Sequence, residues 1–339
     1  MGRGLFKGLI EEDGYKGAKK DWIVELSQSW MYWYEMLVNK NGAGEPFDTR
    51  QMIIDYIKAV KIQLNNNLEK RFIYFICTRP KVRFDTQREP VFNGDVGDCV
   101  LFLKSDAGLH PVSVLFLNPQ TQKPYRPKFE IDEKYITVIE EGGSKVTASV
   151  HDFLMRVGVN IGMSTNVEYV GVTKNPESRP LGGKHAELTN IIYKSLAESR
   201  DVFIGFNLFK VFANAININQ NVGYLVANSM TDEIDAKLEG ELLEKCLIAY
   251  FDSNNQVVNK ARERGELKNN LARLGRENKI NSVYVDYELE LDSEYWQFSS
   301  SVRTSARQHC FTVRLEGDAP VINPGRVTAS ERYEKPHDH

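Results

Sequence analysis

Residues 169–180 read YVGVTKNPESRP, and the fold expected for the second half of the chain rests on this stretch. Its start is typical of a strand, which we expect over 167–173. Its end is typical of a turn, because Asn175 can cap, Pro176 fits the first position of a helical turn and Pro180 stops it. Taken alone, these residues describe a strand that runs into a turn.

The residues that follow predict alternating strands and helices. A helix is expected over 185–199, a strand over 201–209 and a long helix that begins near Thr231. Thr231 can act as the N-cap of that helix, and Asp232 and Glu233 in its first turn interact favourably with the helix dipole. The apolar face of the helix consists of residues at helical spacing: Ile234, Leu238, Leu242, Cys246, Leu247 and Tyr250.

The first half of the chain predicts a helix-and-sheet domain. Residues 22–70 are mostly helical in pattern, with one helix beginning at Asp48 or Thr49. Between 71 and 141 the pattern changes to short β-type runs separated by turns with proline, glycine and asparagine. These runs are RFIYFICT at 71–78, DCVLFLKS at 98–105, VSVLFLN at 112–118 and KYITVIEE at 134–141.

A segment rich in glycine, serine and threonine at 140–149 is the expected linker. We therefore predict an α+β chain with two domains and a tail. A separate N-terminal helix-and-sheet domain occupies 1–145, a domain with a small mixed or antiparallel sheet flanked by helices occupies 146–330, and the tail occupies 331–339. Residues 213–230 are expected to be an insertion in the second domain.

Composition excludes several classes of protein. Apolar residues make up 42% of the chain and charged residues 26%, as in ordinary globular proteins. No apolar run approaches the roughly 20 residues of a membrane-spanning helix, and the N-terminus lacks the pattern of a secretory signal, so we expect a cytoplasmic protein with no membrane partner. The cysteines lie far apart, which predicts reduced thiols. With a net charge of −3 and a pI near 6.1, the chain could attract a polyanion only through a local basic patch.

Two patterns resemble the signatures of the GIY-YIG nucleases. In that family a strand ending in Tyr-Ile-Gly is followed, ten residues after its tyrosine, by an arginine, and Tyr169, Gly171 and Arg179 have this order and spacing. The family also carries a metal-binding glutamate on a later helix, followed by Leu-Ile, an aromatic residue and an asparagine. Glu244 and residues 247–251 match this second pattern. The candidates for the asparagine are Asn254, Asn255 and Asn259.

The resemblance implies a metal-dependent phosphodiesterase. Glu244 would hold Mg²⁺ or Mn²⁺, hard cations that take carboxylate oxygen ligands, and Arg179 would contact the scissile phosphate. Tyr169 would orient or help to deprotonate the attacking water, and His185 is the nearest candidate for a general base. Gly171 would let the backbone approach the substrate closely.

A nucleic-acid partner, DNA rather than RNA, would also require basic residues. The segment 260–279 carries seven basic and three acidic residues, which predicts a local positive surface. An exposed helix of mixed charge is the alternative interpretation. The residues expected to contact nucleic acid are Gly171, Lys174, Lys184, Lys260, Arg262, Arg264 and Lys268.

The first element of the family signature, Gly-Ile-Tyr on the preceding strand, is not found in the expected place before Tyr169. We expect a tyrosine from a neighbouring strand, Tyr135 or Tyr193, to take its place. Glu241 is the alternative metal ligand to Glu244. The preferred hypothesis is an endonuclease that acts on DNA. The alternatives are a non-catalytic protein that uses a similar scaffold to bind nucleic acid or protein, and a structural protein with no link to nucleic acid.

Overall fold

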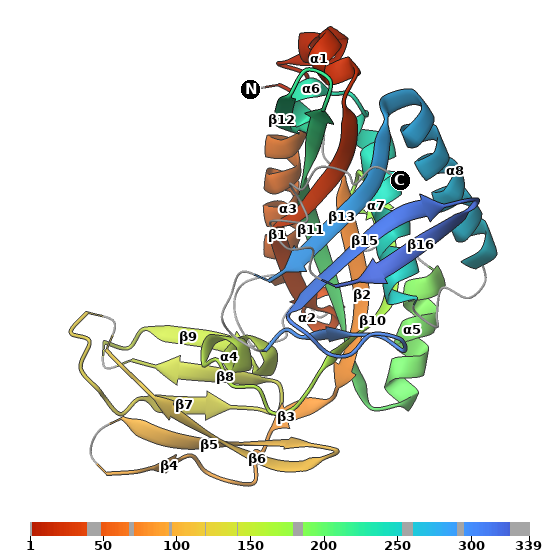
Figure 1. Cartoon of the computed structure of the whole chain (residues 1–339). Helices are drawn as coiled ribbons and strands as arrows, with labels where there is room; N and C mark the ends of the chain where they lie inside the picture. The colour runs from red at the N-terminus through yellow and green to blue at the C-terminus, as the bar shows by residue number, and fades with distance from the viewer. Residues whose placement is uncertain are drawn as a thin grey trace.

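Strand β2 (Phe72–Pro80) lies at the centre of the computed structural model, buried on both of its faces (Figure 1). Its odd-numbered residues from Ile73 to Cys77 pack into one hydrophobic cluster, and its even-numbered residues from Phe72 to Ile76 pack into another. A strand that is apolar on both faces must be covered from both sides. The structure describes residues 2–38, 49–67, 71–94, 97–118, 120–140, 142–178, 186–252, 260–289 and 295–325.

Within the described residues, nine strands form one mixed sheet in the order β14-β10-β2-β11-β1-β13-β15-β16, with β12 also paired to β11. Most neighbours are antiparallel, but β1 with β13 and β10 with β14 are parallel. The bounds of the strands other than β2 are β1 Lys19–Trp33, β10 Thr165–Thr173, β11 Arg200–Asn217, β12 Val222–Ala227, β13 Ile280–Glu288, β14 Phe298–Ser299, β15 Gln308–Glu316 and β16 Ala319–Pro324.

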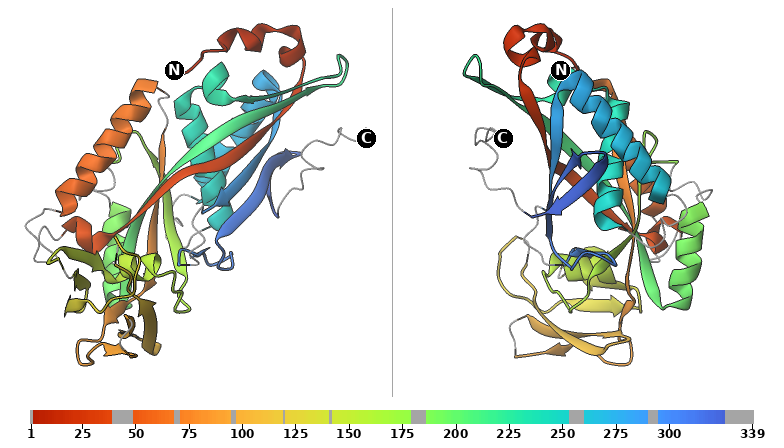
Figure 2. Two further views of the ribbon diagram at one scale, coloured as in Figure 1. Left: turned by 90° about the vertical axis from the view of Figure 1, so that its left-hand side faces the viewer. Right: turned by 45° about the vertical axis from the view of Figure 1, so that its right-hand side comes forward.

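Helices cover both faces of the sheet (Figure 2). On one face, α2 (Tyr34–Val38), α3 (Thr49–Asn67) and α5 (Ala186–Ala197) pack on the even-numbered residues of β2, and we call this core the α3 cluster. On the other face, α7 (Ala236–Phe251) and α8 (Lys260–Asn278) complete the α7 cluster. Shorter helices are η1 (Lys7–Glu11), α1 (Asp13–Lys16) and α6 (Asn228–Thr231). None of the described helices is both long and apolar enough to cross a membrane.

A separate body of β-structure interrupts the chain between β2 and β10, at the lower left of Figure 1. It contains a four-stranded and a three-stranded sheet, together with α4 (Val150–Arg156), and has a core of its own. We call residues 82–156 the inserted domain. Its strands are β3 Val82–Phe84, β4 Val91–Phe92, β5 Asp98–Ser105, β6 Gly108–Leu115, β7 Lys128–Ile131, β8 Tyr135–Ile139 and β9 Lys145–Ser149.

The coarse prediction of an α+β chain is confirmed, but the expected division at residue 145 does not describe the architecture. Strands β1 and β2, from the expected first domain, pair with β11 and β10, from the expected second domain. Residue 145 begins β9, and the expected linker contains the turn between β8 and β9. A hairpin turn and a linker have the same glycine-rich composition, so only the pairing distinguishes them. The expected tail, 331–339, lies outside the described residues.

Two expectations about strands are corrected. Residues 22–33, expected within a helical segment, belong to β1, which pairs with β11 on one edge and with β13 on the other. This pairing outweighs the local pattern. Residues 213–230, expected as an insertion, continue β11 and then form β12 and the start of α6. The expected strands at 71–78 and 98–105 are found as β2 and β5.

The start of the long helix is also corrected. Helix α7 begins at Ala236 because the side chain of Asp235 accepts hydrogen bonds from the amides of Lys237 and Leu238. Thr231, the expected N-cap, instead ends α6. Asp232, between the two, ends α6 with a left-handed backbone (φ 52°), so the helix cannot run on from Thr231 and a new one starts after Asp235.

Buried charged groups join the inserted domain to the large sheet. Arg83 and His151, both from the inserted domain, donate to the carboxylate of Asp201 on β11 at 2.8 and 3.0 Å. The other ring nitrogen of His151 lies 2.6 Å from the Tyr295 hydroxyl, and the Arg79 guanidinium stacks on the Tyr295 ring at 3.8 Å. Burial would raise the pKa of Asp201, but the hydrogen bonds from His151 and Arg83 outweigh it and lower the pKa below its usual range.

We expect the free energy of unfolding to fall as the pH is lowered from about 7.5 to about 5.5. Burial lowers the pKa of His151, and it lowers that of His309 to about 4. The unfolded chain, with an ordinary histidine pKa of about 6.5, takes up protons that the folded chain does not. Each neutral ring therefore contributes stability above that pH. For His309 about 1.4 kcal/mol is lost by about pH 5.5, and His151 adds a loss in the same direction. Urea unfolding at the two pH values measures the loss.

His110 provides the control, because it is only partly buried and its ring contacts the Ser105 hydroxyl. The loss of unfolding free energy between the two pH values should be smaller in His151→Gln and in His309→Gln than in the unmodified protein. It should stay unchanged in His110→Gln. An equal loss in the three variants and the unmodified protein would show that the two buried rings do not cause it.

Candidate functional site

Two tyrosines face each other on the neighbouring strands β2 and β10. The strands are antiparallel, with Tyr74 opposite Gly171 and Ile76 opposite Tyr169. The ring centroids of Tyr74 and Tyr169 are 5.9 Å apart, and both rings pack in the α3 cluster. Tyr74 is fully buried, whereas Tyr169 is partly exposed. Strand pairing therefore places a second tyrosine, Tyr74, beside Tyr169, which the sequence had indicated.

Gly171 is required by the position of the Tyr74 ring. A Cβ atom at this position would lie 2.5 Å from both Cζ and Oη of Tyr74, much closer than atoms in contact can approach. The space above Gly171, expected to admit a substrate, is therefore occupied by the tyrosine. The absence of a side chain here serves packing between β2 and β10.

Glu244 is held against β10 immediately after this glycine. Its Oε1 accepts a hydrogen bond of 2.9 Å from the amide of Val172, and its Oε2 lies 3.3 Å from Nζ of Lys245. Burial raises the pKa of Glu244, although Lys245 and the Val172 amide act in the opposite direction. One turn earlier, the bare backbone of Gly240 packs on Arg71 and Val172. The carboxylate is therefore fixed at the strand rather than free in solvent.

Lys245 joins three carboxylates across α7 and α8. Besides Glu244, its ammonium contacts Glu263 and lies 3.2 Å from Glu266. Burial would lower the pKa of Lys245, but Glu244 and its other acidic neighbours raise it above its usual value. Within the part of the chain that the structure describes, no three histidine, cysteine, aspartate or glutamate side chains are grouped to hold a metal ion. A metal at Glu244 would have to complete its coordination with water or substrate oxygens.

Glu244 and the tyrosine pair approach β10 from different faces of the sheet. Val172, whose amide binds Glu244, packs against the α7 cluster, while Tyr169 packs against the α3 cluster. The edge of β10 that faces away from β2 is paired, among the described strands, only at residues 165–166, where β14 lies beside it. Glu244 and the tyrosine pair therefore lie on opposite faces of β10, beside an edge that the described strands leave mostly unpaired.

The turn after β10 is confirmed as far as Ser178 and is attached to α3. The Asn175 amide donates to Oγ1 of Thr173 at 3.0 Å, and the Ser178 amide donates to the Asn175 carbonyl. Lys61 of α3 donates to the Asn175 side chain at 2.7 Å and pairs with Glu177 at 2.5 Å. The predicted residues Arg179, Lys184 and His185 lie outside the described residues.

The predicted nucleic-acid residues on α8 are mostly engaged with carboxylates. Lys260 pairs with Asp252 at 2.6 Å, Arg262 with Glu266 at 2.8 Å and Lys268 with Asp318 at 3.4 Å. Arg264 is exposed, as is Lys174 beyond β10. Helix α8 therefore presents mixed charges, which matches the alternative interpretation of this segment. The candidate asparagines 254, 255 and 259 lie outside the described residues.

Tyr74 is the site residue that the sequence reasoning missed. The expected substitutes are elsewhere, since Tyr135 packs against Trp33 and Tyr193 is 71% exposed on α5. The signal was present, because Ile73 and Tyr74 reproduce the last two residues of Gly-Ile-Tyr on the strand that neighbours β10. Residues 72–74 and 169–171 are separated in the chain by the inserted domain, so the sequence alone does not show that they pair.

Comparisons with known proteins give no assignment: no family model, no curated protein and no solved structure matches this chain.

Gly171→Ala should lower the free energy of unfolding by about 1–3 kcal/mol, the usual cost of overpacking. The new methyl group would overlap the Tyr74 ring, which is fully buried and cannot swing aside. Urea denaturation measures the change. Gly223→Ala on β12 is the control, because a Cβ there meets no atom within 4 Å. The double variant Gly171→Ala/Tyr74→Leu should recover part of the loss, and no recovery would contradict the proposed contact.

Proposed function

We propose that this chain is a divalent-metal-dependent endonuclease of the GIY-YIG type that hydrolyses phosphodiester bonds in DNA. One observation carries the proposal. Residues 72–74, Phe-Ile-Tyr, and residues 169–171, Tyr-Val-Gly, lie on paired antiparallel strands, with Tyr74 opposite Gly171. Two segments that resemble the two halves of the signature are thus neighbours in space despite their separation in sequence.

The place of Glu244 in the chain order and its oriented carboxylate also support the proposal, whereas its location on the face of β10 opposite Tyr169 counts against a shared site. Its helix, α7, comes after β11, the last of the three neighbouring strands β2, β10 and β11 in chain order, with β12 and α6 between, and this agrees with the order that the resemblance implies. The Val172 amide orients one carboxylate oxygen, and a single oriented carboxylate fits a hard cation that keeps several waters. Mg²⁺ or Mn²⁺ bound there would offset negative charge on the phosphoryl oxygens.

The remaining chemistry is assigned to side chains of this chain. Tyr169 is partly exposed and orients the attacking water, while buried Tyr74 holds its ring in place. Arg179 binds the scissile phosphate with its forked guanidinium. His185 accepts the proton from the water, since a histidine exchanges protons near neutral pH.

A second function is favoured by a specific contact. Lys245 already neutralises Glu244 and also binds Glu263 and Glu266, so the predicted metal ligand has a resident cation. A scaffold that lost catalysis and binds nucleic acid or protein would retain such an arrangement. Salt-sensitive DNA binding without cleavage would support this function over the enzyme.

In assays with supercoiled plasmid and single-stranded DNA and Mg²⁺ or Mn²⁺, we expect Tyr169→Phe, Arg179→Ala and Glu244→Gln each to lower the rate of cleavage by about 10²-fold or more. Gel electrophoresis of the cleaved products measures the rate. Glu277→Gln is the matched control, because Glu277 lies at the end of α8, is exposed and pairs with Arg273 of the same helix at 3.0 Å.

Cleavage that persists unchanged in Glu244→Gln would rule out the proposed metal ligand. Loss of cleavage in Glu277→Gln as well would point to a general effect of removing a carboxylate. Absence of cleavage by the unmodified protein with either metal would rule out the enzyme and leave the binding scaffold to be tested by DNA affinity.

A further inference from the structure

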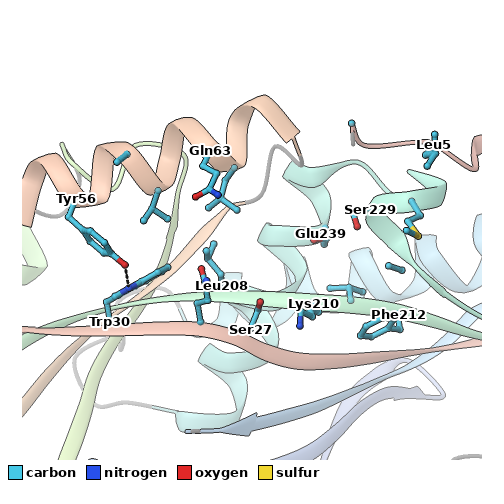
Figure 3. A pocket seen from close by; sticks show the side chains of 18 residues that line it. Leu5, Ser27, Trp30, Tyr56, Gln63, Leu208, Lys210, Phe212, Ser229 and Glu239 are labelled. Atoms are coloured by element: carbon cyan, nitrogen blue, oxygen red, sulfur yellow. Dashed lines mark hydrogen bonds between the residues drawn. The ribbon is translucent and has the colours of Figure 1, made fainter. Parts of the chain in front are cut away.

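A cavity of about 760 Å³ lies between α3 and the sheet, apart from the signature residues (Figure 3). Its walls come from α3, from β1 and β11, and from the segment around α6. Neither Tyr169 nor Glu244 lines it. Cavities that hold small organic ligands in proteins have volumes of about 300–1,000 Å³, so this one is large enough for such a molecule.

The sheet is irregular where it forms the floor of the cavity. On one edge of β11, β2 pairs as far as Asn207 and β12 pairs from Phe212, so no described strand pairs with residues 208–211 on that edge. On its other edge, β1 shifts register between Leu26 and Gln28. A bulge of this kind redirects side chains and often lies beside a binding site. Both irregular segments line the cavity.

The walls are mainly apolar and aromatic. Trp30 of β1 and Tyr56 of α3 meet edge to face, with ring centroids 6.2 Å apart, and the indole nitrogen donates to the Tyr56 hydroxyl at 3.1 Å (Figure 3). Tyr56 is half exposed, so its ring presents surface to a ligand. Leu208 and Met230 continue the apolar lining. Such walls suit a flat apolar body.

The charge of the cavity is positive. Among the described lining residues, the side chains that carry a charge are Lys210 and Glu239. Glu239 is buried and already neutralised, since its carboxylate accepts from Arg3 at 3.0 Å and from Asn228 at 2.5 Å. Lys210 is exposed on β11 opposite Glu25 of β1, and no carboxylate of the described residues, that of Glu25 included, lies within the 4.0 Å of an ion pair from its ammonium. Lys210 is therefore available to an anion.

We infer that this cavity binds a small amphipathic anion, whose flat apolar body lies between Trp30, Tyr56 and the floor of β11 and whose anionic group pairs with Lys210. The site uses none of the residues assigned to cleavage, so it goes beyond the proposed nuclease and stands without it. Amide side chains at the rim, Gln28 and Gln63, offer both donors and acceptors to polar atoms of the ligand.

Two fluorescent probes with the same aromatic body test the inference on the full chain. The probe 8-anilinonaphthalene-1-sulfonate carries an anionic group, and N-phenyl-1-naphthylamine lacks it. We expect one saturable site per chain for each probe. Lys210→Met should weaken the binding of the sulfonate probe about fivefold, as expected for loss of a partly exposed ion pair. The affinity for the neutral probe should not change.

Lys58→Met on α3 is the matched control, because Lys58 pairs with Asp55 outside the cavity and should not affect either probe. Ala59→Trp on the α3 wall and Ser229→Phe on the opposite wall should each prevent binding of both probes, because the larger side chain fills the cavity. Near-ultraviolet circular dichroism shows whether the variants remain folded.

The inference is overturned if binding does not saturate, if both filling variants fold and still bind the probes, or if Lys210→Met and Lys58→Met have the same effect. Selective loss of the sulfonate probe in Lys210→Met, with block by at least one folded filling variant, supports it. Neither result depends on cleavage of DNA, so the outcome is separate from that of the nuclease assays.

Discussion

The burial of β2 on both faces is the constraint on which the rest of the structure depends. The strand pairs with β10 on one side and β11 on the other, and each of its faces is apolar. Water is excluded from both faces only if helices cover them, so α3 and α5 are needed on one side and α7 and α8 on the other. Every feature of the candidate site is positioned relative to this strand.

Buried charge, rather than apolar contact alone, joins separate parts of the molecule. At the root of the inserted domain, Asp201 receives hydrogen bonds from Arg83 and His151, and between α7 and α8 a single lysine, Lys245, binds acidic residues of both helices. Buried ionic groups are costly unless their partners satisfy them, so such contacts specify a particular arrangement more than they add stability. The partners of Asp201 come from distant parts of the sequence, whereas those of Lys245 come from its own helix and the next one.

Helix α3 links two regions that the chain keeps apart. Its Lys61 binds the turn that follows β10, at Asn175 and Glu177, and its Tyr56 forms a wall of the cavity. Both contacts depend on the packing of the helix on the α3 cluster. The position of one amphipathic helix therefore influences both the turn and the cavity.

Patterns of local origin could be predicted from the sequence alone: the strand and turn at 167–178, the strand at 71–78, helix α7 and the α+β class, because side-chain periodicity and turn chemistry depend on near neighbours. Only the tertiary structure showed that Tyr74 lies beside Tyr169, that Gly171 makes room for its ring, and that the inserted domain divides a single sheet. Strand periodicity identifies the face of a residue but not its partner strand, and pairing across an insertion leaves no trace in local sequence.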